Sequence, residues 1–303
     1  MSVLITGCNG FLGRSLLAAL DPAEVVIGID VSPEAASPRI RYSRMDITER
    51  AAVADLFGRH EFSAVYHFAA ITEHHEIVSR KNTTLATNLR GTMNLLECFE
   101  QSRGDRFLFA STGKVYGKMM GAGLNEDSPT EPTNILGKTK LIAESLIRFF
   151  AEGSSRRYAI CRIFNIYGPA QKSSFVVPAI LTQLRAARRI RLGELSHKRD
   201  YIYIDDVVSA LLTIAWAELP AGCSVFNIAS GEPRDVRDIL TEIESLTGCP
   251  IEVDTDPAKL RRDEYGSEYG NTARLEALGW RRREDFRDGL RKTIAYYAPE
   301  LLS

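Results

Sequence analysis

The sequence has few cysteines, almost no net charge and no long hydrophobic run. Its five cysteines among 303 residues are odd in number and widely scattered, and no two stand at a spacing typical of metal ligands. Thirty-eight basic residues against thirty-nine acidic ones leave a formal charge of −1, which removes the electrostatic argument for a nucleic-acid-binding protein. No apolar run approaches the ~18 residues that a membrane-spanning helix needs. These absences favour a reduced, soluble protein without a metal site.

The composition is otherwise that of a folded protein, with 45% hydrophobic and 25% charged residues. The first residues, Met-Ser-Val-Leu-Ile-Thr-Gly, reach a glycine before a hydrophobic signal segment could develop. We therefore expect no secretory or transit signal, no association with a membrane and a cytoplasmic location. The two tryptophans, Trp216 and Trp280, are expected to pack in the interior rather than to form a stacking surface.

Short β-branched runs alternate with longer amphipathic stretches in the first half of the chain, a pattern typical of βαβ units and a parallel sheet. The expected strands are Ser2–Thr6, Val25–Ile29, Ala64–Phe68, Phe107–Ala110 and Tyr158–Ile163. The expected helices between them are Phe11–Leu20, Ala51–Phe57, Thr84–Glu100 and Ile135–Phe150.

The pattern becomes less regular beyond about residue 170. Short strands (Val225–Ile228 and Ile251–Val253) mix with helices (Asp206–Ala217, Val236–Leu246 and Thr272–Leu278). This predicts a smaller α/β lobe, residues 171–303, that follows a larger domain, residues 1–170, with some interleaving of segments. No long linker separates the two, so we expect them to pack into one unit.

Three glycines follow the first expected strand directly, in the run Thr6-Gly7-Cys8-Asn9-Gly10-Phe11-Leu12-Gly13 that leads into a helix. Glycines at this spacing allow a tight turn and the close approach of a pyrophosphate to backbone N–H groups at a helix N-terminus. Asp30 ends the second strand, where a carboxylate can accept hydrogen bonds from a ribose and would repel a 2′-phosphate. The run predicts a dinucleotide-binding domain of the Rossmann type, a doubly wound parallel sheet that binds NAD rather than NADP.

Further motifs extend over nearly the whole chain, and together they resemble the extended short-chain dehydrogenase/reductases, the NAD-dependent nucleotide-sugar epimerase/dehydratase family. The motifs are Gly7-x-x-Gly10-x-x-Gly13, Asp46-Ile47, His67-Phe68-Ala69-Ala70, Asn88, Ser111-Thr112 with Val115-Tyr116-Gly117, Arg162 to Pro169, Arg199 to Asp206 and Phe226 to Gly231.

The resemblance implies a role for each matching position. It implies that Asp46 and Ile47 lie near the adenine, that Phe68, Ala69 and Ala70 line the cofactor pocket, and that Asn88 belongs to the cofactor site. Asn165 and Arg199 would contact the diphosphate of a nucleoside-diphosphate sugar, assisted by Arg262 or its neighbour Arg261. Many relatives form homodimers through helices similar to Thr84–Glu100 and Ile135–Phe150, so the resemblance also implies a homodimer.

The usual catalytic group of this family is a Ser or Thr, a Tyr and a Lys, the last two four residues apart on one helix face. Thr112 and Lys140 match, and the resemblance implies that Lys140 holds the nicotinamide ribose. The tyrosine position is occupied by Leu136, in the run Asn134-Ile135-Leu136-Gly137-Lys138-Thr139-Lys140. Because leucine cannot accept a proton, the usual mechanism is not available.

Three interpretations follow. In the first, Lys114 is the base, because Thr112-Gly113-Lys114 resembles the Thr-Asp-Lys segment of inverting dehydratases that carry methionine at the tyrosine position. In that case a lowered pKa would be needed, and Gly113 departs from the aspartate. In the second, Tyr116, His74 or His75 takes the role, although packing is the favoured role of Tyr116. His67 is expected to be structural or to lie near the cofactor. In the third, the protein binds NAD and a nucleotide sugar without catalysis, as a sensor or partner subunit.

We therefore expect an NAD-dependent nucleotide-sugar epimerase or dehydratase that acts through transient oxidation of a ring carbon, with Thr112, Lys114 and Lys140 as catalytic residues. The alternative is a catalytically silent binding protein.

Overall fold

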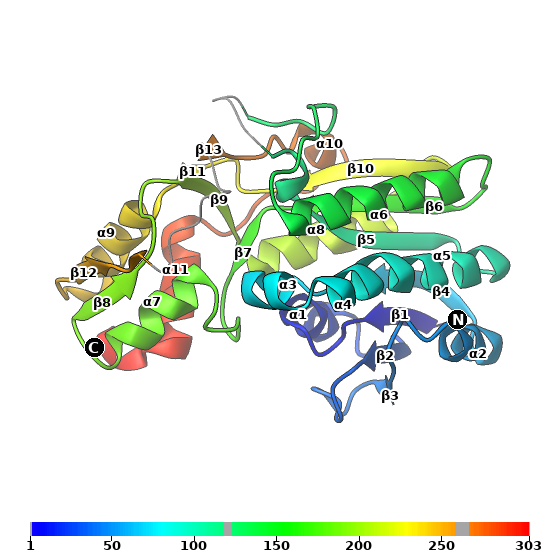
Figure 1. The fold of residues 1–303 in the computed structure, drawn as a ribbon, viewed down its shortest axis with the longest axis horizontal. Coiled ribbons are helices and arrows are strands. Elements are labelled where there is room, and N and C mark those ends of the chain that lie inside the picture. Colours follow the sequence, from blue (N-terminus) through cyan, green and yellow to red (C-terminus); the bar gives the residue numbers. More distant parts are fainter. Residues whose placement is uncertain (1, 118–122, 258–266, 303) are drawn as a thin grey trace.

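The first strand, β1 (Ser2–Thr6), is buried along its whole length, as expected of a strand with helices on both faces of its sheet. The computed structural model describes residues 2–117, 123–257 and 267–302, which form one large sheet and two small ones (Figure 1). The predicted class, an α/β fold with a Rossmann-type parallel sheet, is confirmed.

The large sheet has seven strands, and every pairing between them is parallel. In spatial order they are β10 (Gly222–Ile228), β6 (Arg157–Ile163), β5 (Arg106–Thr112), β4 (Phe62–His67), β1, β2 (Val26–Asp30) and β3 (Arg41–Arg44). The order reverses beside β1, because β2 continues on one side of it and β4 on the other. In doubly wound sheets the ligand crevice opens at such a switch point, outside the carboxyl ends of the strands.

Helices cover both faces of the large sheet. Helices α1 (Phe11–Ala19) and α8 (Ile204–Trp216) contact each other on one face, and α2 (Arg50–Arg59), α5 (Thr92–Gln101) and α6 (Ile135–Ala151) cover the other. On α6 the buried apolar residues Ala143, Ile147 and Ala151 recur every four positions, which gives the helix one core-facing stripe. One apolar core lies on each side of the sheet.

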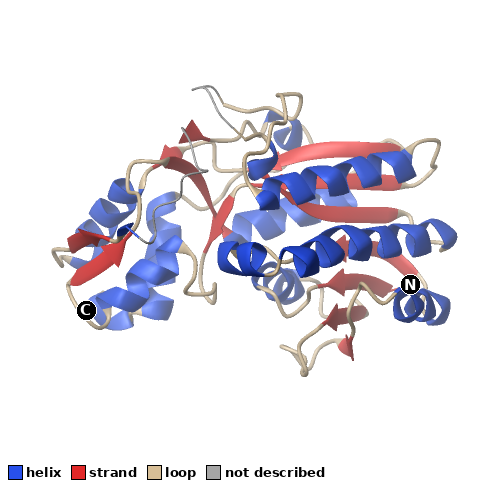
Figure 2. Ribbon diagram, viewed as in Figure 1, coloured by secondary structure: helices blue, strands red, loops and turns tan. Residues whose placement is uncertain are grey.

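The second half of the chain also builds a smaller unit beside the edge at which the strands of the large sheet end (Figure 2). A four-stranded sheet pairs β9 with β7, β11 and β13, and a two-stranded sheet pairs β8 with β12. The elements of the second half outside the large sheet and α8 are β7 (Asn165–Tyr167), α7 (Val176–Leu184), β8 (Arg189–Leu192), β9 (Lys198–Tyr203), β11 (Pro233–Arg234), α9 (Val236–Thr247), β12 (Glu252–Thr255), β13 (Ser267–Glu268), α10 (Ala273–Glu276), α11 (Phe286–Tyr297) and the 3₁₀ turn η4 (Pro299–Leu301).

The single helix predicted over Thr84–Glu100 is divided in the structure. It consists of α4 (Lys81–Leu85), a π-helical turn η1 (Ala86–Gly91) and α5, with the short helix α3 (His74–Ser79) before them. A π-helical turn holds more residues than an α-helical turn, and such turns often occur at functional sites. The amphipathic period alone predicts a regular helix, so the interruption was not foreseen.

The boundary predicted near residue 170 does not divide the chain cleanly. Strand β10 completes the large sheet by pairing with β6, and α8 covers the face that α1 also covers, although both follow residue 170. The expectation for Trp216 was wrong, because it is 69% exposed at the end of α8. Trp280 is buried, as predicted, and its Nε1–H donates to Ser209 Oγ at 2.9 Å.

Two further expectations concern disulfide bonds and membrane-spanning helices. All five cysteines are unpaired. In the described parts of the chain, no helix combines the length and the apolar character that crossing a bilayer requires.

Candidate active site

The glycine-rich turn joins β1 to α1 at the switch point of the sheet. Gly7 has φ 68°, and a Cβ atom there would lie 2.8 Å from the amide nitrogen of Ala69. Gly13 is buried in α1, and a Cβ there would lie 2.4 Å from the Gly7 carbonyl oxygen. Gly10 is exposed at the N-cap of α1, and the next two residues, Phe11 and Leu12, pack partly against the core. The turn thus leaves the amino end of α1 open to an anion.

Asp30 lies beside this turn at the carboxyl end of β2. Its Oδ2 accepts a hydrogen bond from the backbone N–H of Asn9 at 3.1 Å. Its Oδ1 accepts from the backbone N–H and the Oγ hydroxyl of Ser32. The Asn9 side chain is bonded to the backbone of Glu34 and Ala36, so it fixes the segment after β2 against the turn. The Asp30 carboxylate therefore lies where a ribose that follows the pyrophosphate would reach it.

The segment that contains Asp46 and Ile47 is fixed by the inner face of α5. The Asn94 amide donates to the carbonyl oxygens of Ile47 and Thr48 at 2.9 Å and 3.1 Å. A Cβ on Gly91 would lie 2.5 Å from the Ile47 side chain, so the helix passes very close to it. Ile47 is buried, whereas Asp46 is exposed and accepts from the Thr48 amide.

The loop after β4, residues 68–70, is held at both ends. The amides of Phe68 and Ala69 donate to Thr6 Oγ1 at 3.2 Å and 3.1 Å. Farther along, Asn88 on the π-helical turn accepts from the Ile71 amide at 2.8 Å and donates to the Ile71 carbonyl at 3.1 Å. The structure therefore places Asn88 behind this loop, where its amide group orients the loop through the backbone.

His67 ends β4 and is fully enclosed between two threonines. Its Nδ1 lies 2.8 Å from Thr6 Oγ1, and its Nε2 lies 2.9 Å from Thr92 Oγ1. The Thr92 hydroxyl donates its own proton to the Asn88 carbonyl oxygen, so towards His67 it can only accept a hydrogen bond. The neutral His67 ring therefore carries its proton on Nε2. Burial first, and then the charge of Lys140, lowers the His67 pKa to about 3. His67 was expected to be structural or to lie near the cofactor, and the structure shows it buried with a hydrogen-bond partner on each ring nitrogen.

This neutral histidine gives a testable pH dependence. The unfolded chain protonates His67 near its ordinary pKa of about 6.5, whereas the folded protein does so only near 3. Between these values the unfolded state binds more protons, so the free energy of unfolding falls as the pH falls, by up to about 1.4 kcal/mol per pH unit. Urea unfolding between about pH 7 and pH 4 is expected to show this slope, and His67→Gln is expected to lack it. His74→Gln is the control, because His74 is exposed. Equal slopes in the wild type and in His67→Gln would contradict the lowered pKa of His67.

A small cavity lies at the end of β5, beside the start of β7. A cavity of about 30 Å³ is lined by Thr112, Gly113, Lys114, Phe164 and Asn165. Thr112 caps the 3₁₀ turn η2 (Gly113–Val115), and its Oγ1 accepts from the Lys114 amide at 3.3 Å. A Cβ on Gly137 would lie 2.4 Å from the Lys114 carbonyl oxygen, so this turn lies directly against the first turn of α6, which contains Leu136. The turn that contains Lys114 therefore packs against the first turn of α6, in which Leu136 occupies the position where the resemblance expects a tyrosine.

Lys140 lies one helical turn beyond Leu136 and is buried. Its Nζ donates to the Ala110 carbonyl oxygen at 2.7 Å and lies 4.5 Å from the centroid of the Phe109 ring. Burial lowers the Lys140 pKa to about 7, against the opposing charge of Glu144. The ammonium is thus held at the carboxyl end of β5, on the side of the sheet that α6 covers.

Two of the predicted substrate residues, Asn165 and Arg199, lie on β7 and β9 of the four-stranded sheet. Asn165 begins β7, and its Nδ2 donates to the Asp200 carbonyl at 3.1 Å. Arg199 on β9 is buried, and its Nη1 donates to the Lys198 carbonyl oxygen at 2.9 Å. Its neighbour Asp200 accepts from three backbone amides, those of Ser230, Gly231 and Gly270. Arg262 lies outside the described residues.

Two ion pairs near the site were not predicted. Glu144 on α6 and Arg162 on β6 form a buried pair, and Glu73 and Lys172 pair across the two units. Glu144 stands four residues after Lys140, on the same helix face, so its spacing was the available signal. Nothing local in the sequence indicates the Glu73–Lys172 pair, because 99 positions separate its members.

The glycine turn at the switch point, the carboxylate that ends β2 and the buried lysine of α6 define a Rossmann-fold protein that binds a dinucleotide. These residues fit NAD, because the turn offers an open helix N-terminus and Asp30 disfavours a 2′-phosphate. A sequence profile described as "NAD dependent epimerase/dehydratase family" matches residues 3–229. The chain therefore belongs to this family, and NAD is its cofactor.

Individual relatives agree with this assignment. The chain is 32% identical to GDP-6-deoxy-D-mannose reductase of Pseudomonas aeruginosa, over 97% of this chain and 96% of the relative. It is 28% identical to dTDP-D-glucose 4,6-dehydratase of Bos taurus, over 97% of this chain and 88% of the relative.

Solved structures are similar over the full length. MoeE5 in complex with UDP-glucuronic acid and NAD superposes with a TM-score of 0.89 and 26% identity, covering 99% of this chain and 100% of its own. A UDP-glucose 4-epimerase from Thermotoga maritima, solved with UDP-glucose, gives a TM-score of 0.92 and 25% identity, with 99% and 100% coverage.

Proposed function

We propose that this protein epimerises or dehydrates a nucleoside-diphosphate sugar through transient oxidation of a ring carbon, as an isomerase or a lyase. The observation that supports this most directly is the small cavity at the end of β5, which Thr112, Lys114 and Asn165 line together. When bound, NAD supplies an acceptor for the hydride that leaves the ring carbon. The protein must then remove the proton of the hydroxyl on that carbon.

Each catalytic side chain has a distinct part in this proposal. The Thr112 hydroxyl donates a hydrogen bond to the reacting oxygen, and the Lys114 amine takes its proton, since Leu136 cannot. The Lys140 ammonium, directed by Ala110 and buried beside Phe109, orients the ribose next to the reacting centre. Relatives named as a reductase and as a dehydratase support a sugar nucleotide as the substrate class.

The remaining residues bind the two anionic ligands. The cofactor is held by the turn residues Gly7, Asn9, Gly10, Phe11, Leu12 and Gly13, by Asp30, Asp46 and Ile47, and by Phe68, Ala69, Ala70 and Asn88. The sugar diphosphate is held by Asn165, Arg199 and Arg262. The five unpaired cysteines support a reducing compartment, and we assign the protein to the cytoplasm.

A panel of sugar nucleotides tests the proposal. Purified protein with NAD is incubated with UDP-glucose, UDP-glucuronic acid, dTDP-glucose and GDP-mannose, and products are separated by chromatography and weighed by mass spectrometry. A product of unchanged mass indicates epimerisation, and the loss of one water indicates dehydration. We expect one of these changes, with a transient rise in NADH absorbance.

The second candidate, a silent binding protein, rests on Leu136 at the expected tyrosine position. Isothermal titration of the NAD complex with the same sugars separates the two. Tight binding without a product would favour the silent protein and overturn the proposed catalysis.

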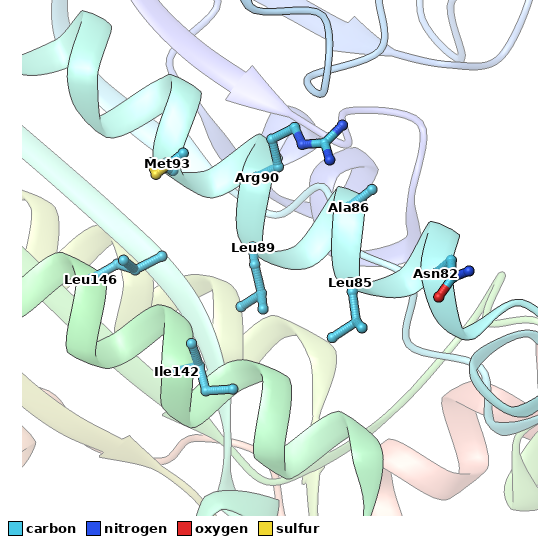
Figure 3. A pocket seen from close by; sticks show the side chains of 8 residues that line it. All are labelled: Asn82, Leu85, Ala86, Leu89, Arg90, Met93, Ile142 and Leu146. Carbon is cyan, nitrogen blue, oxygen red and sulfur yellow. The ribbon is translucent and has the colours of Figure 1, made fainter.

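We also propose a homodimer, in which a second copy covers an apolar groove between the helices α4 to α5 and α6 (Figure 3). The groove has a volume of about 530 Å³ and is lined by Asn82, Leu85, Ala86, Leu89, Arg90, Met93, Ile142 and Leu146. The side chains of Leu85, Met93 and Ile142 are 43%, 38% and 48% exposed. Contiguous exposed apolar surface of this kind is typical of protein–protein contacts, and it lies on the helices that the resemblance implies for the dimer.

A charge in the groove is expected to prevent this association. Leu85→Glu would place a carboxylate in the apolar contact, where desolvation is costly, and is expected to elute from a sizing column at half the wild-type mass. Val25→Glu is the matched control, because Val25 is also 43% exposed but lies outside the groove. Unchanged mass for Leu85→Glu, measured by light scattering, would contradict the proposed dimer face.

A further inference from the structure

A buried ion pair lies beneath the turn that contains Thr112 and Lys114. Arg162 on β6 donates from Nη2 to Glu144 Oε2 at 2.8 Å and from Nε to Glu144 Oε1 at 3.1 Å. The two side chains are 3% and 1% exposed. Two charges this deep must be fully hydrogen-bonded to be tolerated, and both side chains make further bonds.

The pair reaches both ends of the turn. Before the turn, Ser111 Oγ donates to Glu144 Oε1 at 2.5 Å, so the residue next to Thr112 is bonded to the carboxylate. After the turn, the Tyr116 ring lies 4.8 Å from the Arg162 guanidinium, and the Tyr116 hydroxyl donates to Asn227 Oδ1 at 2.6 Å. Both flanks of Thr112 to Val115 are therefore held by the pair or by a direct neighbour of it.

The same arginine connects this turn to a segment on the substrate side. Arg162 Nη1 donates to the Glu126 carbonyl oxygen at 3.0 Å, and the Glu126 carboxylate accepts from the backbone N–H of Asn227 at 2.8 Å. The Asn227 side chain in turn donates to the Leu124 carbonyl at 2.8 Å. The Leu124 amide donates to the Tyr269 carbonyl at 3.0 Å, in the segment that follows β13. The pair is thus linked, through Glu126, Asn227 and Leu124, to the segment that follows β13.

We propose that Glu144 and Arg162 are positioning residues, which hold the turn of Thr112 and Lys114 in one orientation relative to the bound sugar. Stability alone is a weak reason for such a pair, because well-packed apolar residues in its place are often neutral or stabilising. The proposal rests on the proposed function, in which Thr112 and Lys114 act on the sugar. Its first consequence, a rigid turn, does not depend on any substrate.

The main test replaces both charges at once, since a single change would leave an unpaired buried charge. In Glu144→Met/Arg162→Met, the amides of Lys114 and Tyr116 are expected to exchange with deuterium about tenfold faster, because the bonds that close the turn are lost. The amides of residues 7–13 are expected to keep their wild-type rates. Wild-type exchange across residues 111–116 in a folded double variant would overturn the proposal, whether or not a sugar is turned over.

Smaller changes keep the test decisive if the double variant does not fold. Ser111→Ala removes the bond to Glu144, and Ser145→Ala, at an exposed position of the same helix, is its control. Tyr116→Phe removes the bond to Asn227, and Tyr158→Phe, another buried tyrosine outside this network, is its control. Each test variant is expected to exchange faster at Lys114 than its control.

Turnover supplies the second readout, with the sugar that the panel identifies. In the test variants kcat is expected to fall about tenfold, while the dissociation constant of NAD is expected to stay unchanged. Faster exchange combined with full turnover would show that the pair has only a structural role. A panel without any turnover would count against the proposed function and leave the exchange result to decide the rigidity of the turn.

Discussion

Replacement of Lys114 by methionine is expected to lower kcat about 10²- to 10⁴-fold, the range that general acid–base catalysis contributes. The reason is chemical: Leu136 has no group that can accept a proton, whereas Lys114 has an amine and lines one cavity with Thr112 and Asn165. The affinity for NAD, measured by titration calorimetry, is expected to remain at the wild-type value. Steady-state turnover of the sugar that the panel identifies gives kcat.

Two further variants make this prediction decisive. Lys138→Met changes an exposed lysine in the first turn of α6, the helix that contains Leu136, and is expected to keep full turnover. Adding Leu136→Tyr to Lys114→Met is expected to restore part of the lost activity, because a phenol would return to the usual position on the face of α6 that carries Lys140. Full turnover by Lys114→Met alone would exclude Lys114 as the base.

Replacement of Gly13 by alanine is expected to weaken NAD binding at least about tenfold, or about 1.4 kcal/mol. The new Cβ would lie 2.4 Å from the Gly7 carbonyl oxygen and 2.7 Å from the Cys8 Cα. These are backbone atoms, so α1 must move away from the turn, and its open N-terminus moves with it. Overpacking of this kind also costs about 1–3 kcal/mol of folding free energy. Calorimetric titration with NAD and thermal unfolding measure the two effects.

Gly58→Ala is the matched control for this change. A Cβ on Gly58, within α2, meets nothing within 4 Å. Alanine is the better helix former by about 1 kcal/mol, so this variant is expected to be slightly more stable and to bind NAD normally. Wild-type affinity in Gly13→Ala would mean that the turn does not hold the pyrophosphate.

The parts of the fold that local sequence could predict are those in which neighbouring residues form one structural unit. The strand, glycine turn and helix of residues 2–19 are consecutive, and the parallel sheet follows from the alternation of strands and helices. The position of β10 could not be predicted, because its pairing with β6 joins segments that are far apart in the sequence. The π-helical turn was missed for another reason: its residues have ordinary helical patterning, and only tertiary bonds such as those of Asn88 distinguish it.

The candidate site, like the fold, contains parts that the sequence could predict and parts that it could not. The motifs identified Thr112, Lys140 and Asn165 as candidate site residues. In the structure Thr112 ends β5, Lys140 Nζ donates to the Ala110 carbonyl oxygen of the same strand, and Asn165 begins β7. The contact between the Lys114 turn and Gly137 could not be predicted, since it depends on how closely α6 approaches the end of β5. Sequence patterns indicate which residues have side chains suited to catalysis or binding, whereas tertiary packing decides which of these residues lie close together.

The return of the chain into the large sheet affects how the protein can be made. A ribosome has synthesised every cofactor residue of the glycine turn long before β10 and α8 emerge, yet the sheet gains its last strand only at residues 222–228. A nascent chain that ends near residue 170 exposes β6 as an unpaired edge and leaves the α1 face without α8, a state prone to aggregation. The large sheet can therefore be completed only after the chain has been synthesised through residue 228.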